Sequence, residues 1–165
     1  MNIIKTLQEK FDKEILEVKE PVKGKFYLTI PKAAILKFAE YIFNELKGRF
    51  VISVATDTRS ISNDYTITHI FSLDKEKVFI SLDTHLKNDD LNIDSITPII
   101  PGANWAEREA YDMIGVSPKG HPDPRRLFLA DDWPDGVYPL RKDFPYNKKL
   151  ESVPEMSVPL KEPPE

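Results

Sequence analysis

Cysteine is absent from the 165 residues, and this absence excludes more chemistry than any other feature of the composition. Without thiols the chain can form no disulfide, offers no thiolate nucleophile and cannot hold an iron–sulfur cluster through cysteine ligands. Histidine is scarce, since only His69, His85 and His121 occur and they lie far apart. A histidine-rich metal site would have to be assembled by folding and completed by carboxylates. We therefore expect this chain to bind no metal.

Long apolar runs and clustered cations are also missing. No stretch has the roughly 20 apolar residues that cross a bilayer, and the N-terminus lacks a signal-peptide core and a cleavage site. We therefore expect membrane contact only through partners. The net charge is −4 and the pI is near 5.5, whereas phosphate-backbone binding needs a basic stripe. The composition argues against a nucleic-acid partner.

Proline divides the sequence into two parts. Only Pro21 and Pro31 lie before residue 98, and the other twelve of the fourteen prolines lie between Pro98 and Pro164. Proline fixes φ and removes a backbone donor, so long regular elements are excluded from the second part. The sequence predicts an α+β domain over residues 1–115 and an extended, proline-rich, partner-binding C-terminal arm over 116–165.

The first part shows alternating helix and strand signals. Pro31 is placed to open a helix, and the nearly continuous apolar run from Phe50 favours a central strand. We expect an antiparallel or mixed sheet of about four strands with two or three helices. The expected helices are 3–18 and 31–48, and the expected strands are 26–30, 50–56, 65–71 and 78–82.

Residues 104–115 carry start and stop signals for a short helix. Asn104 followed three residues later by Glu107 has the form of a capping box, and Gly115 is typical of a helix end. The helix is also dense in charge. We consider two interpretations of these charges: carboxylates poised for proton transfer, or carboxylates that anchor neighbouring backbone and arginines.

The anchoring interpretation is the better one. Two carboxylates beside an arginine stay ionised, which is wrong for a general acid. Arg108 and Asp112 are four residues apart and are expected to pair on the helix surface. Trp105 and Glu109 have the same spacing, whereas Glu107 points elsewhere.

The segment from Gly120 to Pro124 allows two interpretations of His121. The histidine could be a ligand or a base, but Gly-His-Pro-Asp-Pro is also typical of a rigid turn capped by side chains, which we favour. Asp123 belongs to that turn.

Cations and aromatic residues mix in the rest of the arm. No glycine-rich phosphate loop accompanies the cations, so fork-like pairing with carboxylates, internal or on a partner, is the better use of them. Aromatic side chains in an extended chain resemble interface anchors. The residues concerned are Arg125, Arg126, Trp133, Tyr138, Arg141, Lys142 and Phe144.

These segments resemble a known family. The stretches 105–115, 120–123 and 125–127 resemble the signature of the 30-kDa subunit of respiratory NADH–quinone oxidoreductase, which is called the C subunit in the bacterial complex. Residues 139–145, Pro-Leu-Arg-Lys-Asp-Phe-Pro, match the second hallmark of that family. The resemblance covers roughly residues 104–146.

The same family also serves membrane-bound, energy-converting [NiFe] hydrogenases, formate hydrogenlyases and sulfur-reducing complexes. Val137 and Tyr138 stand where the respiratory branch more often has glycine and histidine. This departure favours the hydrogenase-like branch and argues against NADH and quinone as substrates. The length also suggests a subunit that is not fused to the large catalytic subunit.

The resemblance implies a non-catalytic, cofactor-free, peripheral-arm subunit of an ion-pumping complex at the cytoplasmic face of the cell membrane. Its implied partners are the large catalytic subunit and a small iron–sulfur subunit, and the iron–sulfur clusters and any nickel–iron centre belong to those partners. No catalytic role is carried over. The residues expected to order the arm and the subunit contact are Trp105, Glu107, Arg108, Glu109, Asp112, His121, Asp123, Arg125, Arg126, Trp133, Arg141, Lys142, Asp143 and Phe144.

Three alternatives remain open. The first is the 30-kDa subunit of an oxidoreductase that takes electrons from NADH, ferredoxin or a reduced deazaflavin to a quinone. The second is a stand-alone hydrolase that uses Glu107, Glu109 and His121, which requires these groups to converge in one pocket. The third is a soluble adaptor outside any membrane complex.

Overall fold

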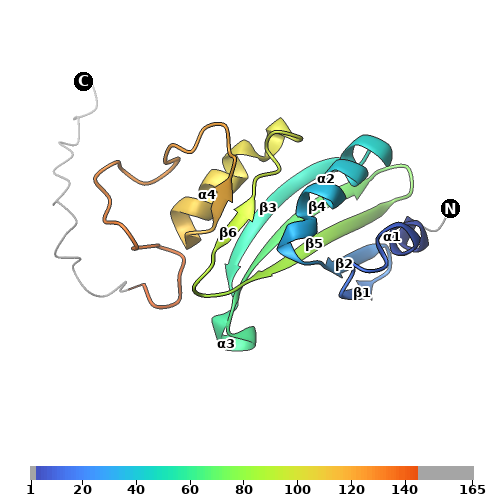
Figure 1. Cartoon of the computed structure of the whole chain (residues 1–165), viewed down its shortest axis with the longest axis horizontal. Helices are drawn as coiled ribbons and strands as arrows, with labels where there is room; N and C mark the ends of the chain where they lie inside the picture. The colour runs from blue at the N-terminus through green and yellow to red at the C-terminus, as the bar shows by residue number, and fades with distance from the viewer. Residues whose placement is uncertain (1–2, 145–165) are drawn as a thin grey trace, which may run out of the picture.

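The computed structural model describes residues 3–144, and these residues form a five-stranded sheet with helices packed against it (Figure 1). No helix in this range is long and apolar enough to cross a membrane. The elements in chain order are α1 (Ile3–Phe11), β1 (Glu17–Val22), β2 (Lys25–Thr29), the 3-10 turn η1 (Lys32–Ala34), α2 (Ile35–Glu40), the π-helical turn η2 (Tyr41–Glu45), β3 (Arg49–Asp57), α3 (Arg59–Ser62), β4 (Tyr65–Leu73), β5 (Val78–Leu86), β6 (Asn92–Asp94), the 3-10 turn η3 (Pro101–Ala103), α4 (Asn104–Ile114) and β7 (Ser117–Lys119).

The main sheet is mixed, with the strand order β1-β2-β5-β4-β3. Strands β3, β4 and β5 form an antiparallel meander, β2 runs parallel to β5, and β1 runs antiparallel to β2. A second sheet consists of β6 and β7 in parallel. The predicted α+β class is confirmed, although the main sheet has five strands rather than about four.

The hydrophobic core lies between one face of this sheet and the helices α1 and α2, and it extends to Ala110 and Ile114 of α4. Because side chains alternate along a strand, every second residue of β4 and β5 faces this core. Phe38, Phe71 and Leu82 are fully buried there, and Phe11 stacks on Phe38 with ring centroids 4.3 Å apart. Figure 1 shows α4 beside β3, at the other end of the sheet from α1.

The prediction of one helix over 3–18 is wrong. Helix α1 ends at Phe11, and the chain returns as β1, which pairs with β2 through the register Glu17↔Thr29. Gly24 adopts a φ of 78° in the tight turn between these strands, a conformation that costs glycine nothing. Pro21 is tolerated because β1 is an edge strand.

The apolar run from Phe50 predicted a central strand, and this prediction is wrong. Strand β3 lies at an edge of the sheet. Val51, Ile52 and Val54 are about two-fifths exposed. The sheet register also shifts between Phe50 and Ile52. The apolar run is therefore explained by a strand that packs on the core with one face and leaves apolar side chains at the surface with the other.

The helical segment expected over 31–48 is present as η1, α2 and η2. Gly48 does not end it through a left-handed conformation, because Lys47 is the residue with positive φ, at 54°. Glycine is needed at position 48 because the backbone there passes close to Ile42. A Cβ there would lie 2.8 Å from Cγ2 of Ile42.

Candidate subunit-contact site around helix α4

Helix α4 begins without the predicted capping box. Its N-cap is Ala103, which makes no side-chain capping bond, and Asn104 is already helical. Glu107 is directed elsewhere, to the chain before the helix. The predicted end is confirmed, because Gly115 caps the helix with a φ of 89°. A side chain at position 115 would meet Arg141, whose Nη2 would lie 2.6 Å from the new Cβ.

Glu107 is a buried anchor for the segment that precedes α4. Its side chain is 2% exposed. The carboxylate accepts hydrogen bonds from Ser95 Oγ at 2.5 Å, from the Ile96 amide at 2.7 Å and from Thr97 Oγ1 at 2.6 Å. Three donors satisfy a buried charge that would otherwise be costly. This geometry supports the anchoring interpretation.

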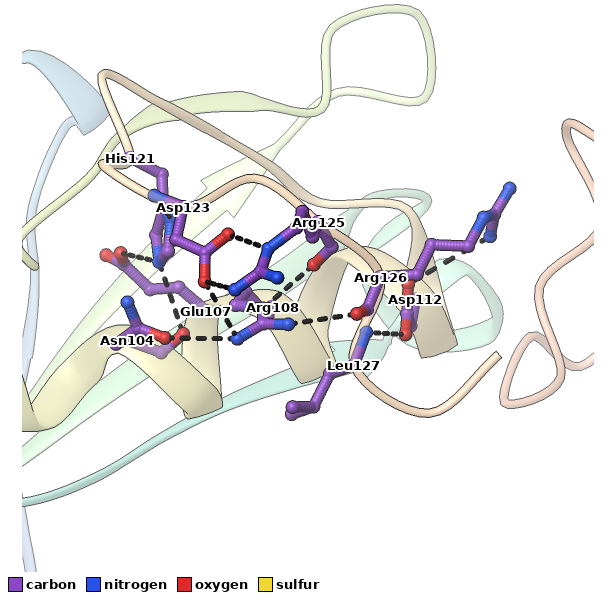
Figure 2. A network of polar contacts seen from close by, with 9 residues as sticks. All are labelled: Asn104, Glu107, Arg108, Asp112, His121, Asp123, Arg125, Arg126 and Leu127. Carbon is purple, nitrogen blue, oxygen red and sulfur yellow. Dashed lines mark hydrogen bonds and ion pairs between the residues drawn. The ribbon is translucent and has the colours of Figure 1, made fainter. Parts of the chain in front are cut away.

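Arg108 binds the arm and not Asp112, so the predicted pair within the helix is wrong. Its guanidinium donates from Nε to the carbonyl of Arg125 at 2.8 Å and from Nη2 to the carbonyl of Arg126 at 2.9 Å. A weaker ion pair joins it to Asp123 at 3.4 Å. The arginine is thereby used to hold the backbone that follows the turn (Figure 2).

Asp112 holds the next part of the same segment. Its side chain has no exposed surface. One carboxylate oxygen, Oδ2, accepts from the amides of Leu127, Phe128 and Leu129 at 2.8, 2.8 and 3.3 Å. Successive amides that converge on one oxygen form an anion-binding concavity. The guanidinium of Arg126 lies 3.9 Å from the other oxygen, as Figure 2 shows.

His121 belongs to a turn, as the sequence favoured. Its Nδ1 accepts the amide hydrogen of Asp123 at 3.0 Å, so the proton of the neutral ring is assigned to Nε2. That nitrogen lies 3.2 Å from the carbonyl oxygen of Asn104. Asp123 accepts a fork from Arg125 at 2.7 and 2.9 Å, and this pair lowers the pKa of Asp123 to about 2. Arg125 thus has an internal partner.

The second signature segment, described as far as residue 144, returns to the body of the domain. The Leu140 amide donates to the carbonyl of Met113 at 3.0 Å, and Arg141 Nε donates to the carbonyl of Ile114 at 2.7 Å. The Arg141 guanidinium also lies 4.1 Å from the ring centre of Tyr138 and 5.0 Å from that of Tyr65. Arg141 therefore binds to the C-terminal end of α4.

Asp57 and Arg59 complete this attachment, although sequence analysis did not single them out. Asp57 is 4% exposed. It accepts the Lys142 amide at 2.9 Å and a fork from Arg59 at 2.6 and 3.0 Å, and the guanidinium holds the pKa of this carboxyl well below its usual range. Arg59 also pairs with Asp143 at 3.0 Å. The partners in the arm are 84 and 85 residues away, so no local pattern could reveal these contacts.

The remaining signature residues divide into two kinds. Trp133 and Phe144 stack on each other with ring centroids 6.5 Å apart and an interplanar angle of 13°, and Trp133 Nε1 donates to the carbonyl of Val137 at 2.8 Å. Trp105 is 70% exposed on α4, and Glu109 is exposed on the same helix. These last two signature residues are available to a partner.

The structure gives the hydrolase hypothesis no support. Glu107 and His121 approach to 3.8 Å but are both nearly fully buried. Glu109 lines a different groove, between α4 and β3. The three groups that the hypothesis needs do not converge. Among residues 3–144, no group of three or more histidine, aspartate or glutamate residues is arranged to hold a metal ion.

Comparison with solved structures identifies the class of fold. A chain of the membrane-bound sulfane sulfur reductase, described as an archaeal respiratory membrane complex, superposes with a TM-score of 0.71 at 22% identity. The match covers 86% of this chain and 83% of that one. The fold is therefore one found in a subunit of a respiratory membrane complex.

The sequence comparison then gives the family. The family described as "Respiratory-chain NADH dehydrogenase, 30 Kd subunit" matches residues 28–150, and the chain belongs to it. The resemblance seen in the signature segments is confirmed, and the match extends well beyond them into β2.

Two relatives represent the two branches. Formate hydrogenlyase subunit 5 of Escherichia coli K12 is 33% identical over 83% of this chain and supports the hydrogenase-like branch. The chain spans only 24% of the length of that relative. The C subunit of NADH-quinone oxidoreductase from Geotalea uraniireducens is 34% identical, and the match covers 84% of each chain.

Proposed function

We propose that this chain is a non-catalytic, cofactor-free accessory subunit of a membrane-bound, ion-pumping, hydrogenase-like oxidoreductase. In this role it packs on the large catalytic subunit, next to a small iron–sulfur subunit, at the cytoplasmic face of the membrane. It supports electron transfer by holding its partners in place, while iron–sulfur clusters and a nickel–iron centre reside in those partners.

The observation that carries this proposal is how the ionised groups around α4 are used. Glu107, Arg108 and Asp112 form their hydrogen bonds with groups of this same chain, mainly backbone and hydroxyl groups. Such groups are positioned to order a surface, since each is already hydrogen-bonded and partly or fully buried. A catalytic group would instead have to lie within hydrogen-bonding distance of a substrate.

We propose the same domain organisation that the sequence predicted. Residues 1–115 are the folded domain, and 116–165 are the arm that meets the partner. The part of the arm up to residue 144 lies along α4 and returns to Asp57. The segment 145–165, which includes Pro145 and the rest of the expected arm, lies outside the described residues.

A second candidate is the 30-kDa subunit of an NADH- or ferredoxin–quinone oxidoreductase. The observation that favours it is the match with the C subunit of the Geotalea uraniireducens NADH-quinone oxidoreductase, which is 34% identical and covers 84% of each chain. The departure at Val137 and Tyr138 favours the hydrogenase-like branch instead.

A metal assay of the purified assembly separates these candidates. The chain is tagged in its native host, membranes are extracted with a gentle detergent, and iron and nickel are measured in what is recovered with the tag. Iron with nickel is expected. Iron without nickel would move the assignment to a quinone- or sulfur-reducing relative. A metal-free chain that survives alone would contradict the subunit proposal.

The signature residue Arg141 offers a variant that bears on the same proposal. Arg141→Ala removes the bond to the carbonyl of Ile114 and the contact with Tyr138 at the C-terminal end of α4. We expect the sheet domain to stay folded, by circular dichroism, while the yield of assembled complex falls. Lys37→Ala is the control, because Lys37, on α2, pairs with Glu14 just after α1 and not with the arm. An unchanged yield of complex with Arg141→Ala would count against an interface role.

A further inference from the structure

An apolar groove runs between the edge strand β3 and helix α4. Its volume is about 140 Å³, and its walls include Ile52, Val54, Ala106, Met113 and Leu140. Pockets for small ligands usually enclose at least roughly 300 Å³. A groove of this size suits a few side chains of an extended polypeptide better than a small molecule.

One wall of the groove is an unpaired strand edge. Among residues 3–144, β3 pairs with β4 on one side and with no strand on the other. An open edge presents backbone N–H and C=O groups that can pair with another chain. Proteins usually protect such edges with charged residues or proline. The middle of β3, Val-Ile-Ser-Val-Ala over 51–55, carries neither.

The side chains around this edge are exposed and apolar. Ile52 and Val54 are 40% and 42% exposed, and Leu140 is 56% exposed. Trp105, at 70%, lies on α4 one turn before Glu109. Edge pairing supplies backbone bonds, and alternate side chains of the added strand fill pockets beside it. The groove between β3 and α4 has both components.

The charge of the groove restricts its occupant. Among the described residues that line it, Glu109 is the one ionisable side chain, and a carboxylate at the rim of an apolar groove favours a cation opposite it. A second copy of this chain, paired symmetrically through the same patch, would bring Glu109 again and no such cation. The complementary occupant is therefore an extended apolar segment that carries a lysine or arginine.

We infer that β3 and α4 receive an extended strand from a partner subunit, which adds to the β3 edge and places a basic side chain against Glu109. This inference rests on the proposed function, since it names one contact surface of the accessory subunit. It also explains why Trp105 and Glu109 differ from the other signature residues of α4, which are turned inward to this chain.

A matched pair of variants in the assembled complex tests the inference. Val54→Lys puts a charge at the groove, whereas Phe79→Lys puts the same charge at an equally exposed site, 39%, elsewhere on the sheet. We expect Val54→Lys to reduce the tagged chain recovered with membrane partners about tenfold, as loss of a central interface anchor does, and Phe79→Lys to leave it unchanged. Both isolated chains should melt like the wild type. Equal recovery of the two variants would overturn the inference.

The occupant is identified by cross-linking in the purified complex. A photo-cross-linking amino acid replaces Val54, and the joined peptides are sequenced by mass spectrometry. A peptide of another subunit, apolar and with a lysine or arginine, supports the inference. A cross-link to residues 145–165 of the same chain, or to a second copy, overturns it.

Charge reversal provides a second readout and separates the two proposals. Glu109→Lys should lower recovery severalfold, and reversal of the cross-linked cation on the partner should restore it. If the wild-type chain brings no metal-containing partners at all, the proposed function fails. If it does, but Val54→Lys and Glu109→Lys assemble normally, only the groove assignment fails.

Discussion

The two ends of the sheet are covered in different ways. At the end of β1 and β2, helices α1 and α2 bury apolar side chains such as Phe38 and Leu7 completely. At the β3 end, α4 and the arm are joined through the buried carboxylates of Glu107, Asp112 and Asp57, each of which accepts several hydrogen bonds. The first end depends on the non-directional hydrophobic effect. The second combines buried apolar residues of α4, such as Ala110 and Ile114, with donors placed at defined positions.

This difference has a consequence for function. A directional network fixes the course of an irregular chain, which apolar contacts alone specify poorly. As far as residue 144 the arm has no helix or strand beyond β7, yet its backbone is held at Leu127, Phe128, Leu129 and Lys142. Polar anchoring thus gives a proline-rich segment one shape that a partner can recognise.

The largest expected effect lies in the apolar end. Leu82→Ala removes a fully buried side chain from the core and should lower the free energy of unfolding by about 4 kcal/mol. Chemical denaturation of the isolated chain measures it. Leu140→Ala, at an exposed position of the arm, is the control and should change stability by less than about 0.5 kcal/mol. Similar losses for both would erase the distinction between the two ends.

The next effect tests the polar end. Glu107→Ala removes the buried acceptor of the hydroxyls of Ser95 and Thr97 and of the amide of Ile96. We expect a loss of about 3 kcal/mol, because unsatisfied buried donors are costly. Glu109→Ala, two residues along the same helix but exposed, should leave the stability of the isolated chain nearly unchanged. Equal effects in denaturation would mean that Glu107 is not an anchor.

A smaller effect concerns pH and the core. His69 is fully buried and bonded through Nδ1 to Ser53 Oγ at 2.6 Å, and burial lowers its pKa to about 4. The unfolded chain, with an ordinary pKa near 6.5, binds the proton first as pH falls. Stability is therefore present above pH 6.5 and is lost between pH 6.5 and pH 4.

Between pH 7 and pH 5 this loss should amount to about 2 kcal/mol. Denaturation curves of the wild type and of His69→Gln at both pH values isolate the histidine from carboxylates that also titrate in acid. A difference between the two proteins that does not change with pH would contradict the assignment.

Regular elements with local signals could be predicted from the sequence. The β4–β5 hairpin, the short helix ended by Gly115, and the turn at His121 all follow from residues close together in the chain. The position of β3 at an edge could not be predicted, because its apolar run is equally consistent with a central strand. The N-terminal helix was predicted too long because apolar residues near Ile15 continued its spacing, although they belong to the approach to β1.

The candidate site could likewise be predicted only in part. The charged residues of α4 could be found because they crowd one short helix, but their partners could not. Arg108 bonds to carbonyls 17 and 18 residues away rather than to Asp112, and Asp57 meets Lys142 across 85 residues. Backbone groups carry no sequence signature, so a side chain that binds backbone leaves no pattern of paired residues.

The most direct test of polar anchoring is hydrogen exchange on the isolated chain, followed by mass spectrometry, for the wild type and for Asp112→Asn. This substitution keeps the size of the side chain but removes the charge that gathers the amides of Leu127, Phe128 and Leu129. The smallest effect on global stability, about 1 kcal/mol, is expected here. Exchange should rise at least several-fold over residues 120–144 and stay unchanged in β4 and β5. Unchanged exchange in the arm would contradict the claim that Asp112 holds it in place.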